Sequence, residues 1–303
     1  MSSEHAQRFT ALRPLLFTIA YEICGSATQA DDILQDSYLR WAAVDLTAIA
    51  DTKSYLATVV TRQALNTLRS EARRREEYVG PWLPEPILVQ PYCAADVMLA
   101  ESVSVAMLVV LETLSPEQRT VFVLSEVFGF RHDEIASIIG KSTSAVRQTA
   151  HRARNHVHAR RPRFAPVDTA HSQKLTTEFL TAAATGDLER LMEMLAADAV
   201  FTTDSDGKVT AARRPIVGAG KVARFVLSLI RRADPSYRIE FAACNSAPAL
   251  LVHHHDQPDT VITFEIVDGL ITHLYAVRNP DKLGAVAVAR PISRVSGQRN
   301  GHP

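Results

Sequence analysis

Two clusters of basic and amide side chains have the spacing that DNA binding requires. In the first, four side chains recur every three or four residues and a further arginine follows them. That spacing places them along one face of a helix, where cations can contact DNA phosphates. We therefore predict a first DNA-contacting surface: Arg62, Asn66, Arg69, Arg73 and Arg74. An ordinary solvated basic face is the alternative interpretation.

The second cluster has the spacing of a helix-turn-helix. Ile135 and Ile139 supply an apolar face, Gly140 supplies the turn and Ser142 can cap the second helix. Donors near the start of that helix can read base edges, and later cations can contact phosphates. We expect these residues to contact DNA: Ser144, Arg147, Gln148, His151, Arg152 and Arg154. A helical hairpin with a solvated basic face is the alternative.

A third segment has the opposite charge. Its side chains would repel DNA and suit a basic protein surface. The candidate protein-binding residues are Asp31, Asp32, Gln35, Asp36, Leu39 and Arg40. A charged, exposed helix face without a partner is the alternative.

The net charge is zero, with 33 basic and 33 acidic side chains, yet the charges are segregated along the chain. Residues 1–51 hold 3 basic and 7 acidic side chains, whereas residues 53–75 hold 6 and 1. Residues 76–134 hold 2 basic and 10 acidic side chains, whereas residues 141–163 hold 7 basic and none acidic. Two separate anionic contacts are therefore compatible with a neutral total.

Composition favours a cytoplasmic protein of two domains. The 47% hydrophobic and 22% charged fractions are ordinary for globular proteins. No apolar run is long enough for a bilayer, and no secretory signal is evident. Cys24, Cys93 and Cys244 lack the spacing of a disulfide framework or metal site. We expect no metal and no cofactor.

Apolar periodicity divides the chain into an all-helical half and an α+β domain. Prolines interrupt the helices between residues 78 and 95. Later, two helices divided by Gly186 are expected over 175–197, and a further helix over 220–231. The expected strands are 200–203, 208–212, 237–243, 249–254, 260–267 and 270–276. The expected divisions are 1–77, 78–95 as a linker, 96–162, 168–284, and 285–303 as a flexible tail.

Taken in order, these segments resemble the extracytoplasmic-function sigma factors of bacterial RNA polymerase. The family's polymerase-binding helix in region 2 resembles ADDILQDSYLRW, and its −10 recognition helix resembles SYLATVVTRQALNTLRSEARRR. Region 4, which reads the −35 element, resembles LSPEQRTVFVLSEVFGFRHDEIASIIGKSTSAVRQTAHRAR. The resemblance implies all-α regions 2 and 4, with core RNA polymerase (its beta and beta-prime subunits) and promoter DNA as partners.

The remainder resembles the subgroup that carries a C-terminal SnoaL-like domain of the ketosteroid-isomerase-like cone fold. The opening of that domain is similar to FLTAAATGDLERLMEMLAADAVFTTD. Three subgroup signatures supply the candidate interdomain residues: Trp82, Leu83, Pro84, Glu85 and Pro86; Asp204, Gly207 and Lys208; and Asn279, Pro280, Asp281, Lys282 and Leu283. The resemblance implies regulation of the sigma factor in cis. Our hypothesis is that Trp82 and the linker dock near residues 279–283.

Acid–base chemistry in the C-terminal domain would need a carboxylate or histidine in its pocket. The candidates are Asp204, Asp206, His253, His255, Glu265 and His273. Strand alternation predicts that His253 and His255 share a face, but no third metal ligand can be placed. No enzyme assignment follows. The alternatives are a one-component regulator that senses a small molecule, and a SnoaL-like isomerase or cyclase fused to a DNA-binding module.

Overall fold

The computed structural model describes residues 2–89, 97–160 and 169–294, without the side chains of residues 2–3, 72–76, 97 and 169. The helical half contains α1 (Ser2–Cys24), α2 (Ala27–Trp41), η1 (Leu46–Ala48), α3 (Thr52–Glu76), α4 (Val97–Ser102), α5 (Val105–Leu111), α6 (Pro116–Phe122), the π-helical η3 (Val123–Val127), α7 (His132–Ile139) and α8 (Thr143–Arg160). In this described part of the chain, no helix has the length and apolarity that crossing a membrane requires.

Local side-chain bonds fix where several helices begin. Ser26 Oγ accepts a hydrogen bond from the Gln29 amide at 3.1 Å, which caps α2. At α6, Ser115 and Gln118 form a capping box, and Pro116 occupies the first turn. These devices satisfy backbone N–H groups that have no partner within the helix.

The C-terminal domain is built on a six-stranded mixed sheet. Its elements are α9 (Thr169–Thr185), α10 (Leu188–Met194), β1 (Leu195–Asp204), β2 (Ile216–Val217), α11 (Ala219–Arg232), β3 (Tyr237–Cys244), β4 (Ala247–His254), β5 (Gln257–Val267), β6 (Leu270–Val277), η4 (Pro280–Lys282) and η5 (Gly284–Ala287). The strand order is β2-β1-β6-β5-β4-β3, in which β1 and β6 are parallel and the other neighbours antiparallel. The expected α+β class is confirmed.

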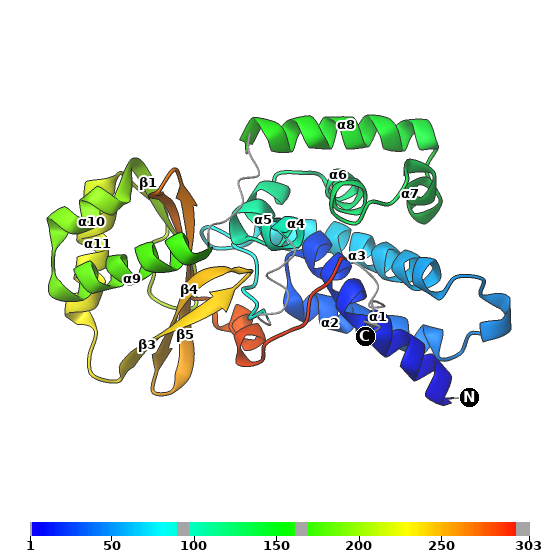
Figure 1. Cartoon of the computed structure of the whole chain (residues 1–303), viewed down its shortest axis with the longest axis horizontal. Helices are drawn as coiled ribbons and strands as arrows, with labels where there is room; N and C mark the ends of the chain where they lie inside the picture. Colours follow the sequence, from blue (N-terminus) through cyan, green and yellow to red (C-terminus); the bar gives the residue numbers. More distant parts are fainter. Residues whose placement is uncertain (1, 90–96, 161–168, 295–303) are drawn as a thin grey trace, which may run out of the picture.

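The sheet separates two apolar cores. On one face, helices α9, α10 and α11 cover a cluster that includes Phe201 and Leu274. On the other face, Leu251 and Tyr275 pack with Val105 of α5. Figure 1 accordingly shows α9, α10 and α11 on the outer side of the sheet and the helical half on its other side. The sheet therefore packs directly against the helical half.

Three expectations about the C-terminal half differ from the structure. No strand forms over residues 208–212, and the short β2 forms instead at Ile216–Val217. The second helix ends at Met194, because β1 begins at Leu195 and continues into the sheet. Residues 284–294 pack against the helical half through buried Ile292, whereas we expected a flexible tail from residue 285. Residues 295–303 of that tail lie outside the described part.

Candidate functional site

Helix α8 presents an exposed polar side opposite a buried apolar side. Val146 and Ala150 are buried against the rest of the helical half. Gly140 ends α7 with a φ of 69°, a left-handed conformation that glycine adopts without strain. Ser142 Oγ then accepts a hydrogen bond from the Ala145 amide at 3.2 Å. The exposed expected DNA contacts are Ser144, Arg147, Gln148, His151 and Arg152.

Arg154 lies differently from the other expected contacts on α8. Its guanidinium donates two hydrogen bonds to the Glu126 carboxylate, at 2.7 and 3.1 Å. This carboxylate holds the pKa of Arg154 above its ordinary value. The ion pair directs Arg154 toward η3 and away from the exposed side of α8.

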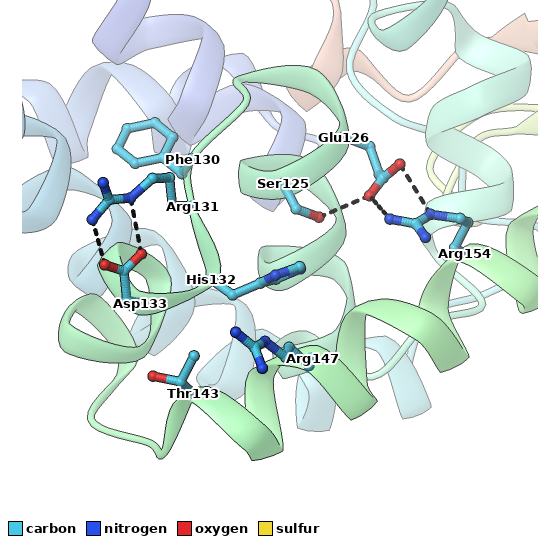
Figure 2. Close-up of a pocket in the computed structure, with 9 residues that line it drawn as sticks. All are labelled: Ser125, Glu126, Phe130, Arg131, His132, Asp133, Thr143, Arg147 and Arg154. Carbon is cyan, nitrogen blue, oxygen red and sulfur yellow. Dashed lines mark hydrogen bonds and ion pairs between the residues drawn. The ribbon is translucent and has the colours of Figure 1, made fainter.

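A cleft of about 600 Å³ opens between η3, α7 and α8. Figure 2 shows Arg131 paired with Asp133 on one side of it, and Arg147 turned toward His132 in the middle. Among the described residues that line the cleft, Arg147 is the arginine without a carboxylate partner. Its guanidinium can therefore donate hydrogen bonds to DNA oxygens without first breaking an ion pair with one of these carboxylates.

The expected −10 face of α3 lies partly against α7. Arg62, Asn66 and Arg69 are exposed along one side of the helix. Arg62 donates to the Ile138 carbonyl at 2.7 Å and to the Ser137 carbonyl at 3.0 Å. These carbonyls belong to the last turn of α7, where a cation is favoured by the helix dipole. Arg73 and Arg74 belong to α3, but their side chains lie outside the described residues.

Helix α2 presents the acidic surface that its spacing predicts. Ile33 and Leu34 are buried on its inner side. The outer side exposes five of the six expected residues: Asp32, Gln35, Asp36, Leu39 and Arg40. The sixth, Asp31, is paired on one side with Arg13 at 3.2 Å and on the other with Arg290. Leu39 is 63% exposed, so α2 combines carboxylates with an apolar side chain available for contact.

A buried ion pair connects the linker with the C-terminal domain. The Asp204 side chain is 0% exposed and lies 2.7 Å from the Lys282 ammonium. Asp204 also accepts hydrogen bonds from the Leu83 amide at 2.7 Å and from the Tyr78 hydroxyl. Lys282 donates to the Leu83 carbonyl at 2.7 Å and lies 4.1 Å from the centroid of a Trp82 ring. Burial, followed by Asp204, raises the pKa of Tyr78. Removal of either charge from such a buried pair is strongly destabilising, because the other charge is left uncompensated.

The neighbouring loop reinforces this junction. Lys208 pairs with Asp281, joining two of the expected signatures directly. Gly207 has a φ of 67°, and a Cβ built on it would lie 3.2 Å from Val79 Cγ1. Asn279 donates to the Tyr78 hydroxyl at 2.8 Å. Pro280 and Asp281 are exposed, and Leu283 is buried in the core that includes Leu83.

The linker also stabilises the start of α2. The Glu85 carboxylate accepts a hydrogen bond from Ser26 Oγ at 2.6 Å and from the Thr28 amide at 2.9 Å. A carboxylate there is favoured by the helix dipole. Pro84 and Pro86 are buried on either side of Glu85. The linker thus contacts both the C-terminal domain and the acidic helix.

Asn245 is a positioning residue that the sequence reasoning missed. It is 0% exposed at the turn between β3 and β4, with a φ of 53°. Its side-chain amide donates to the Tyr21 hydroxyl at 2.6 Å and to the Val103 carbonyl at 2.8 Å, and accepts from the Ile87 amide at 3.1 Å. One side chain therefore joins α1, the residues between α4 and α5, and the linker. Only the Asn-Ser turn itself was visible in the sequence.

A second buried group joins α1, α4 and α6 without the C-terminal domain. Ser102 donates to the Glu22 carboxyl at 2.7 Å, and Arg119 donates to the Glu22 carbonyl at 2.9 Å. Burial raises the pKa of Glu22 to about 8, although Ser102 and Arg119 oppose the shift. Burial also lowers the pKa of Arg119 to about 10. Burial therefore favours the protonated Glu22 carboxyl over the carboxylate.

The expected acid–base candidates do not form one cluster. Asp204 belongs to the interdomain junction, and His253 lies 3.6 Å from Glu240. The expectation that His253 and His255 share a strand face is wrong, because β4 ends at His254 and His255 turns with a φ of 47°. Glu265 accepts a hydrogen bond from the Tyr275 hydroxyl at 2.9 Å. Within the described ranges, no three metal-ligating side chains converge.

Two family models match the helical half of the chain. Residues 8–74 match sigma-70 region 2, and residues 104–157 match sigma-70 region 4. The two matches span the helices that carry the acidic surface, the α3 face and the helix-turn-helix. They define a sigma-70-type transcription factor.

The similarity to individual proteins covers almost the whole chain. The chain is 36% identical to the ECF RNA polymerase sigma factor SigJ of Mycobacterium tuberculosis, over 96% of this chain and 98% of that protein. It is 30% identical to the probable ECF RNA polymerase sigma factor SigI of the same species, over 90% of this chain and 92% of that protein. The crystal structure of M. tuberculosis SigJ matches with a TM-score of 0.75 and 34% identity, over 93% of this chain and 99% of that one. The chain belongs to the extracytoplasmic function (ECF) RNA polymerase sigma factors.

Proposed function

We propose that the chain binds the beta and beta-prime subunits of core RNA polymerase through the outer side of α2, and promoter DNA through α3 and α8. The observation that carries this proposal is the exposure of the polar sides of all three helices opposite buried apolar sides. On α2 the exposed side is acidic, whereas on α3 and α8 it is basic. Opposite charges suit a protein surface and DNA respectively. The chain would act in the cytoplasm, together with polymerase.

On α8, different residues are assigned to bases and to phosphates. Ser144, Arg147 and Gln148 lie in the first turns, which enter the major groove in helix-turn-helix proteins. They would read base edges of the −35 element. His151 and Arg152 lie one turn further along and would contact phosphates. Arg154 would instead hold α8 on η3 through its ion pair with Glu126.

The C-terminal domain is proposed to regulate promoter binding in cis. Its contacts with the linker, through Asp204 and Lys282, coexist with the contact of Arg62 on the last turn of α7. An Arg62 side chain committed to α7 cannot also contact −10 DNA. A tethered domain acts at high effective concentration, so it can hold regions 2 and 4 together without a separate partner. Release of this junction would free the α3 face.

Binding of core polymerase by charge-reversal variants tests the assignment of α2. We expect Asp32→Lys to weaken the complex of the full chain with core polymerase by at least about tenfold, because a rim carboxylate would become a cation. The matched control is Asp198→Lys, which makes the same change at an exposed position of β1. Equal affinity of both variants and the original chain would contradict the assignment.

Initiation by reconstituted polymerase separates the proposal from a one-component regulator. A sigma factor makes core polymerase start at its own promoter, whereas a regulator needs another sigma factor already bound. Promoter-specific initiation with this chain as the sole sigma factor is the expected result. Initiation that depends on a second sigma factor would favour the regulator.

A further inference from the structure

Beyond η4 the chain continues through η5 into an irregular segment, and we call residues 284–294 the C-terminal strap. Figure 1 shows the strap, in red, leaving the C-terminal domain and crossing the helices of region 2. Ile292 is 4% exposed within the same apolar cluster as helix α1. The Ser293 amide donates to Thr18 Oγ1 of α1 at 3.0 Å. The strap is therefore anchored on region 2 by apolar and polar contacts.

Backbone pairing fixes the register of the strap. At the edge of the sheet, Leu88 of the linker pairs antiparallel with Cys244, the last residue of β3. The next linker residue, Val89, pairs parallel with Arg290 of the strap. The Arg290 amide donates to the Leu88 carbonyl at 2.8 Å. The linker thus lies between the edge of the sheet and the strap, as in the addition of strands to a sheet edge. This pairing determines which strap residue reaches α2.

The residue delivered to α2 is Arg290. Its guanidinium forms an ion pair with Asp31, and its carbon atom Cζ lies 5.1 Å from the centroid of the Phe17 ring. Both side chains are partly buried, at 24% and 31% exposure for Arg290 and Asp31. An ion pair that is shielded in this way is screened less than one on an open surface. The strap therefore occupies the carboxylate at one end of the acidic side of α2.

We propose that region 2 carries a peptide-docking surface, formed by Phe17, Thr18 and Asp31, which the strap occupies in cis and from which core polymerase displaces it. This inference rests on the proposed role of α2 in polymerase binding. A basic partner of α2 needs the Asp31 carboxylate and the surface beside it, both of which Arg290 covers. Binding then selects the minority of molecules whose strap is released, and the apparent affinity falls by that fraction.

The first test compares two arginines that contact the same carboxylate. Arg290→Gln removes the cation from the strap, whereas Arg13→Gln removes the cation that α1 supplies to Asp31 at 3.2 Å. With the full chain, we expect Arg290→Gln to tighten binding of core polymerase by about three- to tenfold, because a larger fraction is competent to bind. Arg13→Gln leaves the strap in place and should change the affinity by less than about twofold. An unchanged affinity for Arg290→Gln would overturn the inference.

The second test locks the strap. Cysteines are introduced at positions 18 and 293, because the Thr18 hydroxyl lies 3.0 Å from the Ser293 amide nitrogen and the two residues are therefore neighbours. Oxidation of the Thr18→Cys/Ser293→Cys chain should weaken polymerase binding by at least about tenfold, and reduction should restore it. Each single cysteine variant, oxidised in parallel, controls for the native cysteines. Equal binding by the oxidised and reduced forms would overturn the inference.

The two failures are distinguishable in the same assay. If Asp32→Lys weakens polymerase binding but Arg290→Gln and the locked strap leave it unchanged, α2 is the polymerase contact and the strap inference is wrong. If Asp32→Lys has no effect either, the assignment of α2 is wrong and the strap inference falls with it. Support requires that Asp32→Lys and the locked strap weaken binding and that Arg290→Gln tightens it.

Discussion

Replacing Lys282 with methionine should release the linker from the C-terminal domain. The substitution keeps most of the apolar stem and removes the ammonium, which lies 2.7 Å from the buried Asp204 carboxylate. Asp204 would keep its hydrogen bonds from Tyr78 and Leu83 but lose its counter-ion. An uncompensated buried charge of this kind costs about 3–5 kcal/mol.

The two remaining hydrogen bonds place the expected cost near the lower limit, at about 3 kcal/mol. Undocking of the linker can relieve this cost, so the loss should appear as a shift of the docking equilibrium by about a hundredfold. In the double variant Asp204→Asn/Lys282→Met no buried charge is left unpaired. Its cost should therefore be smaller than the sum of the two single substitutions.

Hydrogen exchange at the Leu83 amide measures this equilibrium, because that amide donates to Asp204 at 2.7 Å. In full-length Lys282→Met the linker amides should exchange about a hundredfold faster than in the original chain. In the double variant they should exchange more slowly than in Lys282→Met. Lys221→Met, at an exposed position of α11, is the matched control. Acceleration of exchange below about fivefold in Lys282→Met would refute the reasoning, because the loss of a solvent-exposed ion pair would accelerate exchange by as much.

Three further results are expected. The pKa of Glu22 is raised to about 8 in the folded chain, whereas it is near 4.5 in the unfolded chain. The free energy of unfolding should therefore fall as the pH rises between these values, by up to about 1.4 kcal/mol per pH unit. In Glu22→Gln the urea midpoints should lack this pH dependence, and a retained dependence would implicate another group. Asn245→Gly keeps the turn but removes the side chain that pairs with the buried Ile87 amide and Val103 carbonyl. It should lower the free energy of unfolding, measured in urea, by about 3 kcal/mol. A loss below about 1 kcal/mol would contradict the role of the Asn245 side chain. Arg147→Ala should reduce the preference of the holoenzyme for its −35 sequence, whereas Arg152→Ala should weaken its binding to all DNA sequences alike. Arg152→Ala should also reduce the slope of log affinity against log salt concentration by about 1. Identical effects of the two substitutions would refute the division between base and phosphate contacts.

Local signals predicted the helices that carry the proposed surfaces. Apolar residues at helical spacing identify α2 and α8, and the Ser115–Gln118 capping box marks the start of α6. In these cases the information lies within a few residues, since a helix is specified by neighbours three and four positions apart. The surfaces of α2 and α8 could therefore be predicted almost residue by residue.

Long-range contacts could not be predicted in the same way. Asn245 lies 224 residues from Tyr21 and 158 from Ile87, and nothing in the spacing of a turn residue indicates such partners. Residues 285–303 were expected to form a flexible tail, because no local pattern indicates that Arg290 pairs with Val89 of the linker. Arg62 was predicted to face outward, and it does, but the last turn of α7 lies against it. Each of these outcomes depends on tertiary packing.

Promoter-specific transcription by purified core polymerase, with this chain as the sole sigma factor, tests the central claim most directly. Transcripts should start at a defined promoter only when the chain is added, and Asp32→Lys should reduce them together with polymerase binding. The absence of specific transcripts at every promoter tested, from a chain that still binds DNA by itself, would contradict the account.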